Sequence, residues 1–147
     1  DKIRVNHGST NEYSEMRADG FVRKWEYGEA KYLNDIYSLF IRADKQWLPS
    51  KPEPLKASLP ASFYKRANTE LVLIPHPPTQ YQLPIDDLIH YYLYYDTTCR
   101  VISSNFWYRE PVVTIEAYSH IRAIDSDANP TLNRYYPLDV HLLAIGK

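Results

Sequence analysis

The side chains with the most chemical capacity lie near the C-terminal end of the chain, on two runs that alternate apolar and polar residues. They are Glu116, Tyr118 and His120 in the run 112–123, and Asp139 and His141 in the run 136–145. A histidine beside a carboxylate can perform general acid–base chemistry. Directly opposed residues on antiparallel strands lie about 4.5–5.5 Å apart. If the two runs pair, these side chains share one face and form a polar patch or the wall of an enzyme pocket.

The same residues also suit a water-exposed sheet face, where they provide solubility and cross-strand pairing. We therefore assign no catalytic residue. The chain has no Gly-x-Ser-x-Gly motif and no phosphate-binding glycine loop, and only four glycines in all. The single cysteine, Cys99, is close to Val101 and Ile102, which predicts a buried and unreactive thiol. No cofactor is expected.

Three oxygen-bearing residues recur at alternate positions, as at the start of a calcium loop: Asp125, Asp127 and Asn129. Pro130 stands where such loops need glycine, and Tyr136 stands where they need a bidentate glutamate. This excludes an EF-hand. A looser cation site remains an alternative to a turn whose Asx side chains bond their own backbone, and we assign no metal.

Aromatic residues are unusually frequent, with 14 Tyr, 3 Trp and 4 Phe. Tyrosines occur as doublets at 91–92, 94–95 and 135–136. In a strand a doublet sends one ring to each face, so these rings either form a tyrosine-rich core or reach an interface, where tyrosine is enriched. Trp25 and Trp107 are candidate stacking platforms for a carbohydrate or another small ligand.

Composition excludes several classes of protein. The 147 residues are 44% hydrophobic and 24% charged, which is typical of a folded globular domain. The 17 basic residues are scattered and nearly balance 18 acidic ones, which argues against nucleic-acid binding. The longest strongly apolar run, 88–95, is far shorter than the roughly 20 residues of a membrane helix, so no membrane span is expected. The sequence does not indicate a compartment.

The elements that would position these residues are one helix and a set of strands. Leu33, Ile36, Tyr37 and Phe40 recur at helical spacing and predict an amphipathic helix over residues 29–45. Residues 21–27 alternate like a strand. Four prolines between residues 49 and 60 indicate extended connectors. Residues 85–95 combine a helix-start pattern with the aromatic content of a strand, and we favour a strand.

These patterns predict a single domain, 1–147, with residues 1–19 as an N-terminal arm. The predicted fold class is α+β: a mostly antiparallel sheet ending in a C-terminal meander, packed against one main helix and bounded by proline-rich connectors. The favoured function is a non-enzymatic binding or assembly component that contacts a protein partner, or further copies of itself, through aromatic strand surfaces. Carbohydrate or small-ligand binding on an aromatic sheet face, and an enzyme with a His–carboxylate pocket, are the alternatives.

Overall fold

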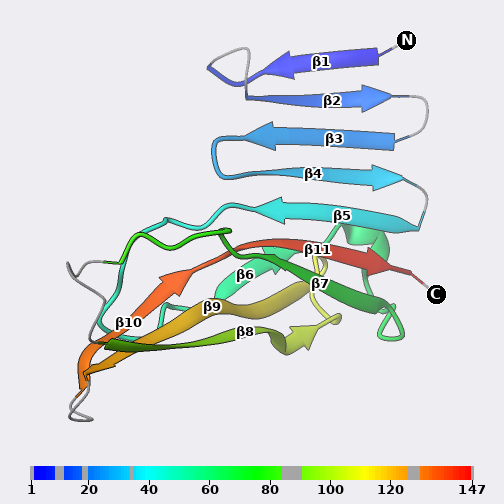
Figure 1. Ribbon diagram of the computed structural model, residues 1–147. Helices are drawn as coiled ribbons and strands as arrows, with labels where there is room; N and C mark the ends of the chain where they lie inside the picture. The colour runs from blue at the N-terminus through cyan, green and yellow to red at the C-terminus, as the bar shows by residue number, and fades with distance from the viewer. Residues whose placement is uncertain are drawn as a thin grey trace.

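The protein folds almost entirely into antiparallel β-strands, arranged as two sheets (Figure 1). The computed structural model describes residues 2–8, 12–17, 20–33, 35–83, 91–125 and 130–146. The larger sheet has the order β1-β2-β3-β4-β5-β11-β7. Its strands are β1 (Lys2–Asn6), β2 (Tyr13–Arg17), β3 (Gly20–Trp25), β4 (Gly28–Leu33), β5 (Ile36–Ile41), β7 (Glu70–His76) and β11 (Asp139–Ile145).

The smaller sheet is built around one long strand, β9. Its strands are β6 (Leu55–Ser58), β8 (Tyr91–Asn105), β9 (Val112–Asp125) and β10 (Pro130–Pro137). β8 pairs with β9 over nearly its whole length, whereas β10 and β6 pair with different parts of β9. One short 3-10 helix, Ala61–Phe63, is the only helical element of the described residues, and none of their helices is long and apolar enough to cross a membrane.

The helix predicted for residues 29–45 is wrong, and with it the α+β fold class. That segment forms β4 and β5, which are joined by two residues and pair Leu33 with Ile36. Apolar residues three apart can lie on one helical face, but they can also lie opposite each other across a two-residue hairpin. Beyond the turn, Tyr37 and Leu39 are buried, whereas Ile36 is exposed and Ser38 is half-buried. This alternation is the two-residue period of a strand.

The C-terminal meander is also corrected. The run 112–123 is a strand as predicted, but it does not pair with residues 139–145. The predicted run 136–145 divides at Leu138: β10 ends at Pro137, and β11 crosses to the larger sheet, where it lies between β5 and β7. At the crossing, the backbone N–H of Leu138 donates to the carbonyl of Ala117, 3.2 Å away. Proline cannot donate to a ladder, which favours ending β10 at this point.

The core lies between the inner faces of the two sheets, which alternate as the sequence indicates. On β9 the buried face consists of Val113, Ile115, Ala117, Ser119, Ile121 and Ala123. Opposite it, Leu138, Val140, Leu142 and Ala144 from β11 and its junction are 0–1% exposed. Phe63 and Phe106, from segments that connect strands, complete this core.

The larger sheet extends beyond the smaller one. Figure 1 shows β4, β3, β2 and β1 stacked outward from β5, away from β6, β8, β9 and β10. Some positions of β5 face the core, and the register aligns them with one face of the outer strands. We call this continuous face of β1–β5 the apolar face. On β1–β5 the described members of the apolar face are Ile3, Val5, Ser14, Met16, Phe21, Arg23, Trp25, Gly28, Ala30, Tyr37, Leu39 and Ile41.

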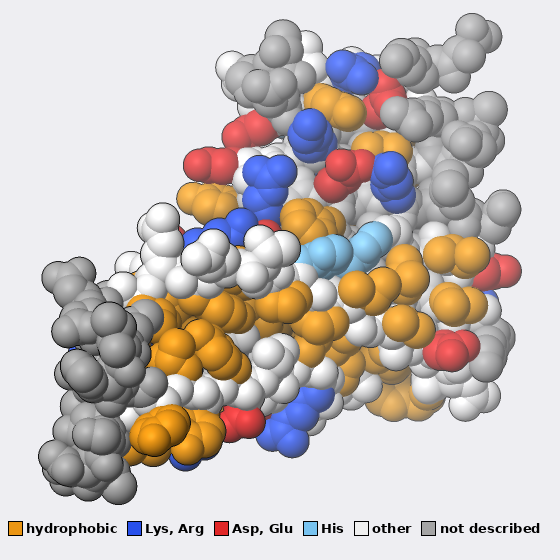
Figure 2. Space-filling model, viewed as in Figure 1, with side chains coloured by type: hydrophobic (Ala, Val, Ile, Leu, Met, Phe, Trp, Pro, Cys, Tyr) orange, Lys and Arg blue, Asp and Glu red, His pale blue; other side chains and the backbone are white. Residues whose placement is uncertain are grey.

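The opposite face of β1–β5, which we call the charged face, carries side chains of both signs. Arg4 pairs with Glu15 at 3.2 Å, and Lys31 pairs with Glu29 at the same distance. Figure 2 shows blue and red side chains mixed over these strands. Among the described residues of β1–β5, Arg23 is the only charged member of the apolar face.

The proline-rich segment 49–60 is only partly a connector. It contains β6, which pairs with the first half of β9, and it buries Ala57 and Leu59. Just before it, the backbones of Leu48 and Tyr135 exchange two hydrogen bonds of 2.9 Å. The segment therefore lies against the smaller sheet and supplies part of its inner layer.

Truncating a core side chain on β11 tests the two-layer packing. Leu142→Ala removes a fully buried side chain and should lower the free energy of unfolding by about 2–5 kcal/mol, because it removes apolar contacts and leaves a cavity. Ile74→Ala, on the adjacent strand but 41% exposed, is the matched control and should cost much less. Chemical denaturation measures both values. Equal losses from the two variants would contradict the assignment of the inner face.

Candidate functional site

The first candidate site is an open pocket at the place where the smaller sheet stops covering the apolar face. It has a volume of about 420 Å³ and lies between β3–β5 and the strand β6. Its lining residues are Phe21, Arg23, Trp25, Ala30, Tyr37, Leu39, Ile41, Lys56, Ala57 and Ser58. Ligand pockets commonly have volumes of roughly 300–1,000 Å³, with mostly apolar walls and a few polar groups. This pocket has that composition.

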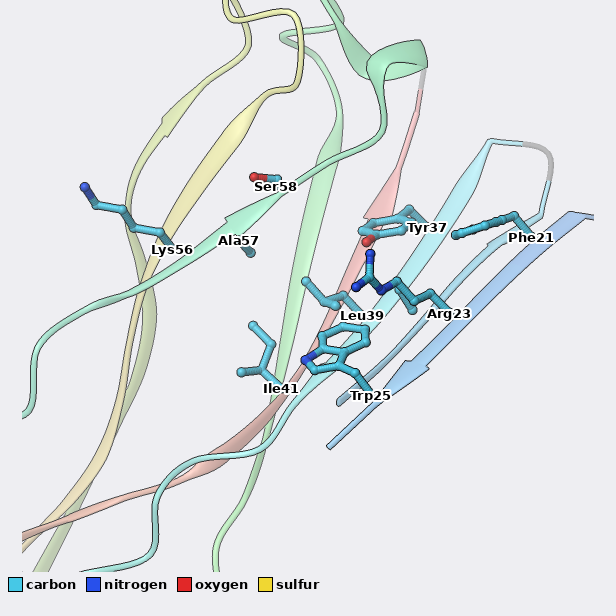
Figure 3. Close-up of a pocket in the computed structure, with 10 residues that line it drawn as sticks. Phe21, Arg23, Trp25, Tyr37, Leu39, Ile41, Lys56, Ala57 and Ser58 are labelled. Carbon is cyan, nitrogen blue, oxygen red and sulfur yellow. The ribbon is translucent and has the colours of Figure 1, made fainter. Parts of the chain in front are cut away.

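The polar groups that line the pocket are two cations, Arg23 and Lys56, and two neutral hydroxyl groups, of Tyr37 and Ser58. Figure 3 shows the Arg23 guanidinium between the Tyr37 hydroxyl and the Trp25 ring, while Lys56 points away from them. The Arg23 guanidinium carbon lies 5.8 Å from the centre of the Trp25 ring, within reach of a cation–π interaction. Burial raises the pKa of Tyr37 to about 12, although the Arg23 charge opposes the rise. The Tyr37 hydroxyl is therefore neutral at physiological pH.

Beyond the pocket, the apolar face is exposed on β1 and β2. Ile3, Val5 and Met16 are 71%, 56% and 63% exposed. Ile3 lies opposite Met16 in the β1–β2 register, and Met16 lies opposite Phe21 in the β2–β3 register. The pocket and these exposed residues are therefore parts of one continuous surface.

The two tryptophans proposed as stacking platforms do not share a site. Trp25 lines the pocket. Trp107 lies between β8 and β9, is 65% exposed, and its backbone N–H donates to Asn105 Oδ1. Trp107 is not among the residues that line the pocket.

Glu116 and Tyr118 lie on the outer face of β9 and form an ion cluster with neighbouring cations. The Glu116 carboxylate accepts a 3.0 Å hydrogen bond from Arg100 Nε and pairs with Lys51 at 3.2 Å. These contacts hold the pKa of Glu116 below its usual value, and the hydrogen bond from Arg100 is the largest cause. A carboxylate kept ionised by two cations is poorly suited to carry a proton in catalysis.

His120 lies on the same outer face, and its ring contacts two neighbouring side chains. Its ring stacks on Tyr135, with centroids 4.4 Å apart, and its Nε2 is at hydrogen-bond distance from Asn133 Oδ1. Tyr118 contacts the same Tyr135 ring edge-on. Among the hydrogen bonds of the described residues, the His120 ring has Asn133 as its partner and no carboxylate.

The expected meeting of His120 with Asp139 and His141 is wrong, because β11 belongs to the other sheet. Asp139 is 8% exposed, accepts a 2.8 Å hydrogen bond from the Ala43 N–H and pairs with Lys45 at 3.0 Å. These contacts attach the segment after β5 to β11. Asp139 therefore has a structural role in the described geometry.

His141 lines a smaller hollow on the charged side of the larger sheet. This hollow has a volume of about 240 Å³ and is lined by Glu29, Lys31, Ser38, Phe40, His76 and His141. The His76 and His141 ring centroids are 6.4 Å apart. Burial first, and then the charge of His76, lower the pKa of His141. Both effects favour the neutral imidazole.

Metal ligation receives no support from the described residues, none of which form a group of three or more His, Cys, Asp or Glu side chains able to hold an ion. Asp127 and Asn129 lie outside the described residues, and Asp125 ends β9. The cation-site alternative at residues 125–129 therefore stays a prediction. Cys99 is half-buried rather than buried as predicted, and burial raises the pKa of its thiol, which disfavours the reactive thiolate.

The tyrosine doublet at 135–136 behaves as strand geometry requires. Tyr135 lies on the outer face with His120, whereas Tyr136 packs against Trp47 and Tyr81 on the other side. Tyr92, Tyr94 and Tyr95 of β8 are 62%, 48% and 48% exposed. Tyrosines thus reach the surface of the smaller sheet.

Sequence reasoning missed most of the pocket and the exposed patch. The alternation of residues 21–27 puts Phe21, Arg23 and Trp25 on one side of a strand, which is the available signal, but Tyr37 and Leu39 fall within the segment 29–45 that was predicted as a helix. Ile3 and Val5 fall within residues 1–19, which were predicted as an N-terminal arm. Their common surface is visible only once the register joins the five strands β1–β5.

Replacing His76 tests the electrostatics of the smaller hollow. We expect His76→Ala to raise the pKa of His141, because a nearby positive charge is removed, yet to leave it below 6.5, because burial is the larger cause. In the unaltered protein the depressed pKa should make stability fall as pH drops below 6.5, where unfolding takes up a proton. Histidine NMR titration measures the pKa, with the exposed His7→Ala as control. An unchanged His141 titration in His76→Ala would refute the coupling.

Comparisons with known proteins assign no family to this chain. No family model, no curated protein and no solved structure matches it. The function of the surfaces described above is therefore inferred from their own geometry and chemistry.

Proposed function

We propose that the protein is a non-enzymatic binding component that docks an extended segment of a partner protein along β1. The observation that carries this proposal is the exposure of Ile3, Val5 and Met16 in one patch on the apolar face. Single exposed hydrophobic residues are ordinary, whereas contiguous exposed apolar surface marks interaction sites.

An open strand edge adjoins this patch. β1 ends the strand order of the larger sheet, so among the described strands only β2 pairs with it. An edge strand presents unpaired N–H and C=O groups that accept an added strand. A peptide that extends the sheet in this way gains main-chain hydrogen bonds from the edge and side-chain contacts from the face.

Charge selects the occupant of this edge. The sequence of β1 holds two basic residues and no acidic one. Arg4, between Ile3 and Val5, lies on the charged face, where it pairs with Glu15 and its side chain is 38% exposed. A second copy added antiparallel would bring basic residues close to basic residues, which destabilises a pair of strands. A partner segment that alternates apolar and acidic residues would instead place apolar side chains beside Ile3 and Val5, and carboxylates near the part-exposed Arg4 guanidinium.

The alternatives have less support. The histidines of the enzyme hypothesis lie on different sheets, and Glu116 and Asp139 are each held by lysine or arginine partners. Trp25 and Trp107, the platforms of the carbohydrate hypothesis, do not line one site. The exposed tyrosines of β8 also lie on an edge strand, because among the described strands β8 pairs only with β9. Their hydroxyl groups can remain hydrated, however, whereas the exposed side chains of Ile3, Val5 and Met16 are apolar.

A short peptide of alternating Val and Glu residues tests the docking surface. We expect it to bind and to slow amide hydrogen exchange in β1, and we expect a Val–Lys peptide of equal length to bind more weakly. Ile3→Asp should weaken binding of the Val–Glu peptide about tenfold, because it places a charge in the apolar contact. Fluorescence anisotropy of the labelled peptides measures the affinities.

Ile36→Asp is the matched control, because Ile36 is 49% exposed on the opposite face of the same sheet. It should leave peptide binding unchanged. Equal binding of the two peptides, or no protection of the β1 amides, would refute the proposal. Sedimentation that shows a homodimer dissociated by Ile3→Asp would make the occupant a second copy and would also refute it.

A further inference from the structure

We propose that the pocket between β3–β5 and β6 is a binding site for a small apolar monocarboxylate, whose carboxylate is bound by Arg23 and whose apolar body packs on the aromatic walls. This site is distinct in ligand and in contacts from the docking edge of β1. It does not depend on the partner proposed above.

The shape and walls of the pocket fit an apolar body. Its 420 Å³ lie within the range of small-molecule sites. Phe21 and Trp25 are half-buried on one wall, and Tyr37, Leu39 and Ile41 continue the wall toward the core. Figure 3 shows these side chains on the same side of the sheet as Ala57 and Ser58 of β6.

The charge of the pocket fits a single anion. Among the described residues that line it, Arg23 and Lys56 are cationic and none is acidic, and Lys56 points away from Arg23. The nearby acidic side chains on β2 and β4, Glu15 and Glu29, lie on the charged face of the sheet, where Arg4 and Lys31 contact them. Arg23 has no carboxylate partner among the hydrogen bonds and ion pairs of the described residues. A guanidinium presents paired N–H donors that match a carboxylate.

The position of Arg23 would allow the pocket to select an anionic ligand over a neutral or cationic one. Its guanidinium is exposed at the open side of the pocket, in contact range of the Trp25 ring. The Tyr37 hydroxyl beside it is neutral, so the wall adds no negative charge that would repel an anion. A ligand would thus leave its carboxylate near solvent and bury its apolar part.

Three probes with the same apolar chain separate charge from burial: decanoate, decanol and decyltrimethylammonium. Isothermal titration of the unaltered protein should show decanoate binding at least about tenfold more tightly than decanol, with the cation weakest. The difference should disappear as pH falls through the pKa of the decanoate carboxyl group. Equal affinities for decanoate and decanol at neutral pH, or no decanoate binding below millimolar concentration, would overturn the proposal without any variant.

Variants then locate the site. Arg23→Gln should reduce decanoate affinity about tenfold and leave decanol affinity unchanged. Lys24→Gln, which removes the same charge one position along β3 on the other face, should change neither. Ser58→Phe, at an exposed position on the pocket wall, should weaken both probes by filling the space they occupy. Circular dichroism confirms that each variant folds. Undiminished decanoate binding in folded Arg23→Gln and Ser58→Phe would place the ligand elsewhere and refute the site.

Discussion

The structure depends on one apolar sheet face that is longer than the layer packed against it. On β11, Val140, Leu142 and Ala144 are fully buried against the inner face of β9, and this contact holds the two sheets together. The same face continues through β5 and β4 to β1. Apolar surface needs a second layer to remove it from water, and the smaller sheet supplies that layer only over part of the larger one. The pocket marks where the cover ends, and Ile3 and Met16 lie beyond it.

Charged side chains of the outer strands lie almost entirely on one of their two faces, which leaves the other face apolar. Arg4, Glu15, Glu29 and Lys31 form contacts on the charged face, which is typical of a sheet surface in water. Arg23 breaks the division, because it is a cation on the apolar face beside aromatic rings. Its guanidinium is exposed at the open side of the pocket, so its N–H donors are accessible to an anion from solvent. That position connects the pocket to an anionic ligand more directly than its volume does.

The polar residues that drew attention in the sequence have structural explanations. Glu116 binds Arg100 and Lys51, Asp139 attaches the segment after β5, and His120 stacks on Tyr135. The prediction of an alternating strand at 112–123 was confirmed, with its apolar positions buried, since a two-residue period over so many positions has no other simple explanation. The prediction of a helix at 29–45 was wrong because its four apolar residues span a hairpin turn, and spacing alone does not distinguish the two. Of the candidate site, only Trp25 was predicted.

The sequence by itself determined which strand positions are apolar, because alternation is a local property set by the two-residue period of the backbone. It also determined that Arg23 shares a side with Phe21 and Trp25. Only the tertiary structure decided that β11 leaves β10 for the other sheet, and that β6 covers β5 but not β1. Those outcomes depend on pairing between residues distant in the chain, where competing registers bury similar apolar side chains and differ only in the packing of the whole.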